Sequence, residues 1–308
     1  LNPVTATPPC INDPEVVPGG SSSGAAASVA FGLAAAGIGS DTGGSVRIPS
    51  AWNDLVGLKT TSGRLSLDGV VPLVTSFDTA GPLCRSVEDA ALVLAALEGG
   101  KSVDLRGSSL AGARFAVLNT VAIDDLQPEP ASGFREAVKK LCSHGAEIVD
   151  IEAAEVAEAM GHSGVLFAPE AYATWGAEIE ANPEAMFEPV RERFRAGRGM
   201  LAHEVASAWQ NLRVLRADWA RRVASFDAVL VPTAPIIPPK TADLLADHAY
   251  FVDQNLLALR NTRIGNLMGL CVLTLPTGVP STGIRLMGKP YHEENLLRLG
   301  IAAEAALS

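Results

Sequence analysis

Residues 18–50 read PGGSSSGAAASVAFGLAAAGIGSDTGGSVRIPS, and this stretch decides how the rest of the chain is interpreted. It begins and ends with clusters of glycine and serine, separated by a run of small apolar residues. Small residues at this density predict a buried helix over residues 24–36 that packs closely against a neighbour and ends at Gly37. The run lacks the length of a transmembrane span and the basic flank of a signal peptide, so it predicts neither membrane insertion nor export.

The second cluster, Asp41-Thr42-Gly43-Gly44-Ser45, favours a reaction centre. Two glycines beside a serine let successive backbone N–H groups point to one side, and such a nest binds an anion such as a tetrahedral oxyanion. Ser45 is the candidate nucleophile. An ordinary tight turn explains the same five residues, so both interpretations stay open. Asp41 and Arg47 flank the serine, and we predict a structural ion pair rather than a clamp for a substrate carboxylate.

The first cluster, Gly20 to Gly24, matches the GxSxG nucleophile elbow with Ser22 at its centre. That elbow requires a hydrophobic strand before it, but asparagine, aspartate and proline occupy the approach at 12–18. A phosphate loop requires a lysine, and none occurs before Lys59. Both interpretations are therefore weak.

The composition excludes several classes of protein. The 308 residues carry 24 Lys and Arg against 34 Asp and Glu, a net charge of −10, and 48% are apolar. Global disorder is excluded, and the acidic balance argues against nucleic acid or an anionic membrane as a partner. The cysteines form no CxxC and the histidines no HExxH, so we predict no metal site and no cofactor. Scattered thiols favour a cytoplasmic location.

Downstream of residue 85, short apolar runs alternate with helical patterns, which predicts an α/β fold with a sheet covered on both faces. Ser86, followed three residues later by Asp89, begins a helix in the manner of a capping box. The other predicted elements are strands at 114–118, 147–151, 227–232, 271–275 and 283–287, helices at 132–144, 252–268 and 293–307, and mostly helical residues over 153–224.

Pro169 predicts a break in this helical stretch, near Tyr172 and Trp175. The two aromatic residues are three apart and share a face if helical. Core packing and an aromatic pocket wall both explain them. With Gly20 and Ser22, they are the candidate substrate-binding residues.

Taken together, the two clusters resemble the amidase signature family. The strongest resemblance runs from Pro18 to Ala91 through PGGSSSG, GSDTGGSVRIPS, VGLKTT and FDTAGPLCRSVEDA, with weaker echoes at 226–235, 266–278 and 283–299. It implies a single α/β/α domain over residues 1–308, with its core motifs at 18–91 and a central mixed sheet covered by helices on both faces.

The resemblance also implies a Ser-cisSer-Lys triad. Ser45 matches the nucleophile, and Ser21 matches the cis-serine that relays its proton, so the Gly20–Ser21 peptide bond is expected to be cis. The amides of the oxyanion hole match Thr42, Gly43, Gly44 and Ser45.

The triad's lysine is the main departure from the family pattern. In the family it lies well upstream of the cis-serine, but residues 1–20 contain no lysine. Lys59, in VGLKTT, resembles a structural segment and is not assigned as the base. We therefore expect the catalytic lysine outside this chain, and we expect a domain that lacks its N-terminal part, because the chain begins with Leu1 rather than Met.

The implied function is hydrolysis of a small carboxamide or related linear C–N bond, not a peptide bond, through an acyl-enzyme. Two alternatives stay open: the glutamine-hydrolysing component of a tRNA-dependent glutamine amidotransferase, which needs partner chains, and a catalytically dead member of the family. The expected partner is a small-molecule amide, with no nucleic acid and no membrane, and a homodimer is left open.

Overall fold

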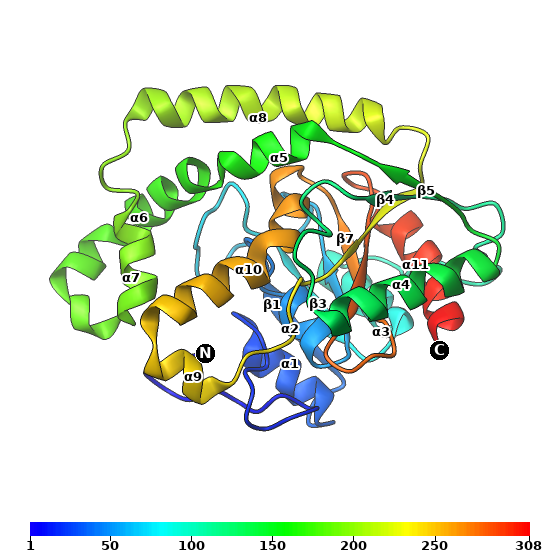
Figure 1. The fold of residues 1–308 in the computed structure, drawn as a ribbon, viewed down its shortest axis with the longest axis horizontal. Helices are drawn as coiled ribbons and strands as arrows, with labels where there is room; N and C mark the ends of the chain where they lie inside the picture. Colours follow the sequence, from blue (N-terminus) through cyan, green and yellow to red (C-terminus); the bar gives the residue numbers. More distant parts are fainter.

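The computed structural model describes residues 1–308 and is organised around one eight-stranded sheet (Figure 1). The strands lie in the order β1-β3-β2-β7-β8-β6-β4-β5. Their bounds are β1 Ala36–Ser40, β2 Val56–Lys59, β3 Ala80–Cys84, β4 Arg114–Leu118, β5 Glu147–Ile151, β6 Ala228–Pro232, β7 Val272–Pro276 and β8 Gly283–Met287. The predicted mixed sheet is therefore confirmed.

Parallel pairing in this sheet is confined to one end. Strands β5, β4 and β6 pair in parallel, because the helices between them return the chain to the same edge, whereas the other neighbours pair antiparallel. Strand β2 pairs with β7, which follows it by more than 200 residues, so the motif region 18–91 and the C-terminal part of the chain form one sheet.

Helices cover both faces, as the sequence predicts. One face carries α3 (Val87–Glu98), α4 (Pro128–Ser143) and α11 (Glu293–Leu307). The other face and the outer layer carry α1 Ser23–Ala30, α2 Arg47–Trp52, α5 Ala154–Gly161, α6 Ser163–Ala181, η1 Pro183–Ala185, α7 Glu188–Arg195, α8 Ala202–Arg222, α9 Thr241–Ala246 and α10 His248–Leu267.

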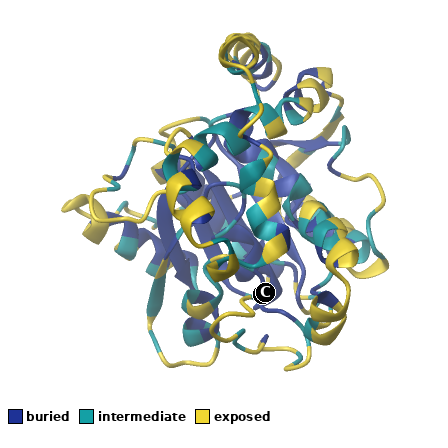
Figure 2. Ribbon diagram, turned by 90° about the vertical axis from the view of Figure 1, so that its left-hand side faces the viewer, coloured by how far each residue is buried: buried dark blue, intermediate teal, exposed yellow.

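Strand β6 shows how the sheet separates the two cores. Ala228 and Leu230 face the apolar cluster beneath α3, α4 and α11, whereas Val229 and Val231 face the cluster beneath α8 and α10. Successive side chains of a strand point to opposite faces, so a continuous apolar run indicates a strand buried on both sides. Figure 2 shows the strands buried at the centre and the exposed residues on the outer turns of the helices.

Two of the predicted helices begin or end where the sequence indicates. Helix α11 spans the predicted range 293–307, and α3 begins after Ser86, whose side chain accepts a hydrogen bond from the Asp89 N–H at 3.1 Å. The left-handed Gly99, with φ of 67°, ends α3.

The predicted helix over 24–36 is wrong in its extent and in its burial. Helix α1 ends at Ala30, Leu33 is exposed, and the chain continues as strand β1. The small residues do serve close packing, but between the helix and the strand: a Cβ on Gly37 would lie 3.0 Å from the carbonyl oxygen of Ala25. Pairing of β1 with β3 satisfies the backbone of 36–40 at the sheet edge.

Pro169 does not break the helical stretch, so this prediction is also wrong. Helix α6 runs through it from Ser163 to Ala181, and the break lies earlier, at His162 between α5 and α6. A proline inside a helix removes one backbone hydrogen bond, and the many other bonds of this 19-residue helix maintain it.

The close approach of strands β2 and β3 can be tested by substituting a glycine between them. A methyl group on Gly81 of β3 would overlap the carbonyl oxygen of Leu58 in β2. We expect Gly81→Ala to lower the free energy of unfolding by about 1–3 kcal/mol, measured by urea denaturation. Gly24→Ala in α1 is the control, because nothing lies within 4 Å of the added methyl. Equal effects of the two substitutions would contradict this packing.

Candidate active site

The structure brings the two predicted catalytic serines together. Ser45 lies in the turn between β1 and α2, and Ser21 lies two residues before the start of α1 at Ser23. The N–H of Ser22 donates to the carbonyl of Ser45 at 3.2 Å, so the two loops are joined beside both hydroxyl groups. The Ser22 hydroxyl donates to the Ser40 carbonyl at 3.3 Å, and the Gly20–Ser21 peptide bond is cis, as the resemblance implies.

Both serines are accessible from outside. Ser21 is exposed and Ser45 is half-buried, and neither hydroxyl hydrogen bonds to another group of the chain. No strand leads into Ser22, since residues 11–20 form turns and one isolated bridge. The arrangement therefore lacks the strand that a nucleophile elbow requires.

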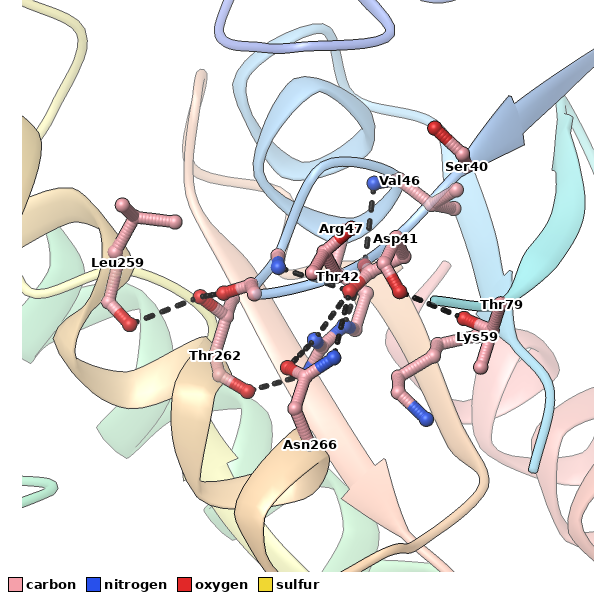
Figure 3. A network of polar contacts seen from close by, with 12 residues as sticks. Ser40, Asp41, Thr42, Val46, Arg47, Lys59, Thr79, Leu259, Thr262 and Asn266 are labelled. Atoms are coloured by element: carbon pink, nitrogen blue, oxygen red, sulfur yellow. Dashed lines mark hydrogen bonds and ion pairs between the residues drawn. The ribbon is translucent and has the colours of Figure 1, made fainter. Parts of the chain in front are cut away.

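A buried ion pair holds the loop that carries Ser45 (Figure 3). Asp41 and Arg47 are both fully buried and form a bidentate pair, with Nε–Oδ2 at 2.9 Å and Nη2–Oδ1 at 2.8 Å. The carboxylate also accepts from the N–H groups of Gly44 at 2.8 Å and Val46 at 3.1 Å. Burial by itself raises the pKa of Asp41, but the charge and hydrogen bonds of Arg47 outweigh it and hold that pKa well below its usual range. The predicted structural ion pair is present.

Residues of helix α10 make further hydrogen bonds to the Asp41–Arg47 pair. Arg47 Nη1 donates to the carbonyl of Thr262 at 2.7 Å and Nη2 to Asn266 Oδ1 at 2.5 Å, while the Asn266 amide donates to Asp41 at 3.1 Å. The Thr262 hydroxyl donates to the carbonyl of Gly43 at 2.6 Å. All of these contacts pull the loop 41–47 onto one face of α10 (Figure 3).

The ion pair also decides which amides remain free in the predicted oxyanion hole. The Gly44 N–H is engaged with Asp41, whereas those of Thr42, Gly43 and Ser45 make no hydrogen bond within the chain. Gly44 has φ of 141°, in a region that favours glycine, and its backbone lies against the Thr262 side chain. Three of the four predicted amides therefore have no hydrogen-bond partner within the chain.

The predicted aromatic residues of α6 make contacts within the protein. The Tyr172 hydroxyl donates to Glu180 at 3.3 Å, and Trp175 Nε1 donates to the carbonyl of Pro72 at 2.8 Å. Both side chains are half-buried, and neither of these bonds reaches the loop 41–47. A role for them in substrate binding stays a prediction.

Lys59 is buried behind the ion pair. Its amine donates to the carbonyls of Thr60 and Leu270, each at 2.9 Å. The residue lines a cavity of about 520 Å³, and neither Ser21 nor Ser45 is among the residues that line this cavity. Burial, together with the positive charge of Arg47, lowers the pKa of Lys59 to about 8. These contacts fit a structural lysine rather than the base of a serine pair.

Comparison with known proteins agrees with this geometry. The family model described as Amidase matches residues 2–297. The chain belongs to the amidase signature family. Among its relatives, the 2-amino-5-chloromuconic acid deaminase of Comamonas testosteroni is 37% identical over 300 residues, covering 94% of this chain and 64% of that protein. A glutamyl-tRNA(Gln) amidotransferase component from Roseiflexus castenholzii is 33% identical, covering 94% of this chain and 66% of that protein.

The fold matches the family as well. A solved crystal structure of an amidase is 29% identical and superposes with a TM-score of 0.84, covering 97% of this chain and 69% of that one. The chain spans slightly less than two thirds of the length of the two relatives above. None of its helices combines the length and apolar character needed to cross a membrane.

Sequence reasoning missed the contribution of α10 to the site. Thr262 and Asn266 are one turn apart and buried, which places two polar side chains on an inner face of the helix. A signal was available: asparagine and threonine recur in a helix that lacks a clear apolar stripe. Without the fold, however, nothing in the sequence joins these residues to Asp41, more than 200 positions away.

Removing one partner of the buried pair tests its structural role. Asp41→Asn leaves the guanidinium of Arg47 buried without a counter-charge, so we expect a loss of about 3–5 kcal/mol in the free energy of unfolding, measured by urea denaturation. The control is Asp104→Asn, which removes an exposed ion pair with Arg106 and is expected to leave the midpoint unchanged. A loss below about 1 kcal/mol in Asp41→Asn would contradict the role given to this pair.

The lowered pKa of Lys59 predicts a pH dependence of stability. Between about 8 in the folded state and about 10.4 in the unfolded state, only the unfolded chain keeps the proton on this amine, so stability rises with pH in this window. Urea unfolding of the native protein and of Lys59→Met, compared at each pH, isolates this amine. We expect the difference to move by up to about 3 kcal/mol in favour of the native protein from pH 7.5 to 10. A flat difference would show that Lys59 titrates normally.

Proposed function

We propose that this protein hydrolyses a small carboxamide through Ser45 as nucleophile. The observation that carries the proposal is the junction of the two serine loops, in which the Ser22 N–H binds the Ser45 carbonyl and leaves both serine hydroxyls accessible. Beside it, the free amides of Thr42, Gly43 and Ser45 offer donors to a developing oxyanion. The family membership agrees with acyl transfer at this site.

The proposed mechanism begins with proton removal, because a serine hydroxyl is a weak nucleophile. Ser45 attacks the amide carbon while Ser21 accepts its proton and passes its own to a neutral lysine base, a role that the contacts of Lys59 do not fit. The tetrahedral intermediate collapses, ammonia or an amine leaves with a proton, and an acyl-enzyme remains on Ser45. Water then attacks the ester, and the same groups return the protons. No step requires a metal or a cofactor.

An amidotransferase component is the second candidate, and the 33% identity to a glutamyl-tRNA(Gln) amidotransferase chain favours it. The relative with 37% identity is named for the deamination of an amino-substituted chloromuconic acid, a small molecule. We place the small-molecule hydrolase first because of this relative. The four cysteines are free and three of them are buried, which supports a cytoplasmic location.

Substitution of the nucleophile tests the proposal. We expect Ser45→Ala to lower ammonia release from simple aliphatic amides by about 10³-fold or more and to abolish labelling by a serine-directed phosphonate, while the melting temperature is retained. Ser22→Ala is the comparison variant: because Ser22 is a candidate for substrate binding and not for the nucleophile, we expect it to lower activity far less than Ser45→Ala. Loss of activity in Ser22→Ala with full activity in Ser45→Ala would support the elbow interpretation instead.

The two candidate functions separate on their need for partners. A small-molecule amidase releases ammonia as the isolated protein, whereas an amidotransferase component is expected to require its partner chains and an acceptor. Activity on simple amides without added protein therefore supports the first candidate, and activity on glutamine only after partners are added supports the second.

A further inference from the structure

One face of α10 lies directly against the loop that carries the candidate nucleophile. A methyl group placed on Gly43 would lie 3.7 Å from Leu259 Cδ2 and 3.9 Å from Arg263 Cγ. The hydrogen bond from Thr262 to the Gly43 carbonyl fixes this turn of the helix to the loop. The aliphatic stem of Arg263 therefore begins beside Gly43, two residues before Ser45.

The charge of Arg263 has no partner in the chain. The guanidinium of Arg47, on the same loop, donates its hydrogen bonds to Asp41, Asn266 and the Thr262 carbonyl. Arg263 is half-buried and forms neither an ion pair nor a hydrogen bond within the chain. Burial, with the positive charge of Arg193 nearby, lowers the pKa of Arg263 to about 10, so it remains protonated at neutral pH. A partly desolvated cation without a counter-charge is costly unless an anion binds it.

A second cation lies on the same side. Arg193 of α7 donates to Asn255, which is two turns before Arg263 on α10. The acidic side chains of α7 are committed elsewhere: Glu188 pairs with His248, and Glu192 pairs with arginines of its own helix. The carboxylates of α7 therefore neutralise neither Arg193 nor Arg263.

We propose that Arg263 binds a carboxylate of the substrate, and that the substrates are monoamides of short dicarboxylic acids. This inference rests on the proposed function. Arginine is suited to the task because its planar guanidinium donates two parallel hydrogen bonds to a carboxylate. The stem of Arg263 starts at the oxyanion loop, so one small molecule spans both groups.

A binding measurement tests Arg263 without requiring turnover. In the Ser45→Ala protein, isothermal titration compares succinamate with butyramide, which keeps the amide and replaces the carboxylate by a methyl group. We expect succinamate to bind at least about 10-fold more tightly, in line with a charge-assisted bidentate contact, and Arg263→Gln to remove this difference. The control is Arg260→Gln, one turn away on α10, whose guanidinium binds the carbonyl of Asp124. Equal binding of succinamate with and without Arg263 would overturn the proposal.

Turnover gives the second measurement, with Ser45 intact. We expect Arg263→Gln to lower kcat/KM for succinamate by about 10- to 100-fold and to change that for butyramide by less than about 3-fold, with partial rescue in Arg263→Lys. Because Arg263 makes no hydrogen bond within the chain, the melting temperature is expected to be retained. An equal loss on both amides, or no preference for succinamate in the native protein, would overturn the proposal.

The two measurements also separate this inference from the proposed function. If succinamate binding depends on Arg263 but no amide is hydrolysed, the carboxylate site stands and the amidase proposal fails. If both amides are hydrolysed equally well, with and without Arg263, the amidase proposal stands and the carboxylate site fails.

Discussion

The fully buried pair of Asp41 and Arg47 is the interaction on which the arrangement of the site depends. Neither charge reaches solvent, so every donor and acceptor around the pair must be supplied by the protein. The backbone N–H groups of Gly44 and Val46 and the side chain of Asn266 meet this demand. A buried ion pair is weak evidence for net stability, because desolvation offsets its attraction. Its clear consequence here is geometric: the pair joins the two ends of the loop 41–47 and binds two of the backbone amides between them.

That geometry has consequences for the chemistry. The pair uses the Gly44 amide, whereas the amides of Thr42, Gly43 and Ser45 make no hydrogen bond within the chain. It also draws the loop onto α10, which brings the stem of Arg263 beside Gly43. Two arginines that contact this loop therefore differ in their hydrogen bonding. Arg47 is saturated by protein groups and holds the loop, whereas Arg263 keeps its donors free for a ligand.

The sequence was most informative where a local rule decides the structure. The cap at Ser86, the helix over 293–307 and the apolar strand over 228–232 each follow from capping or periodicity within a few neighbouring residues. It was misleading over 24–36, where a helix and an edge strand share the same small residues. There the outcome depends on pairing of β1 with β3, more than 40 residues away. Pro169 misled for a related reason, because the rest of α6 tolerates the missing hydrogen bond.

The sequence by itself determined the fold class and the family resemblance and singled out the two candidate serines, because all of these reside in contiguous motifs whose spacing is visible in one dimension. Only the tertiary structure decided that Gly44 is unavailable to an oxyanion, that Lys59 faces carbonyl groups rather than the serines, and that Thr262, Arg263 and Asn266 belong beside the site. These facts depend on which surfaces the sheet brings into contact. Since β2 pairs with a strand more than 200 residues further along the chain, no local pattern records that α10 will lie against the nucleophile loop.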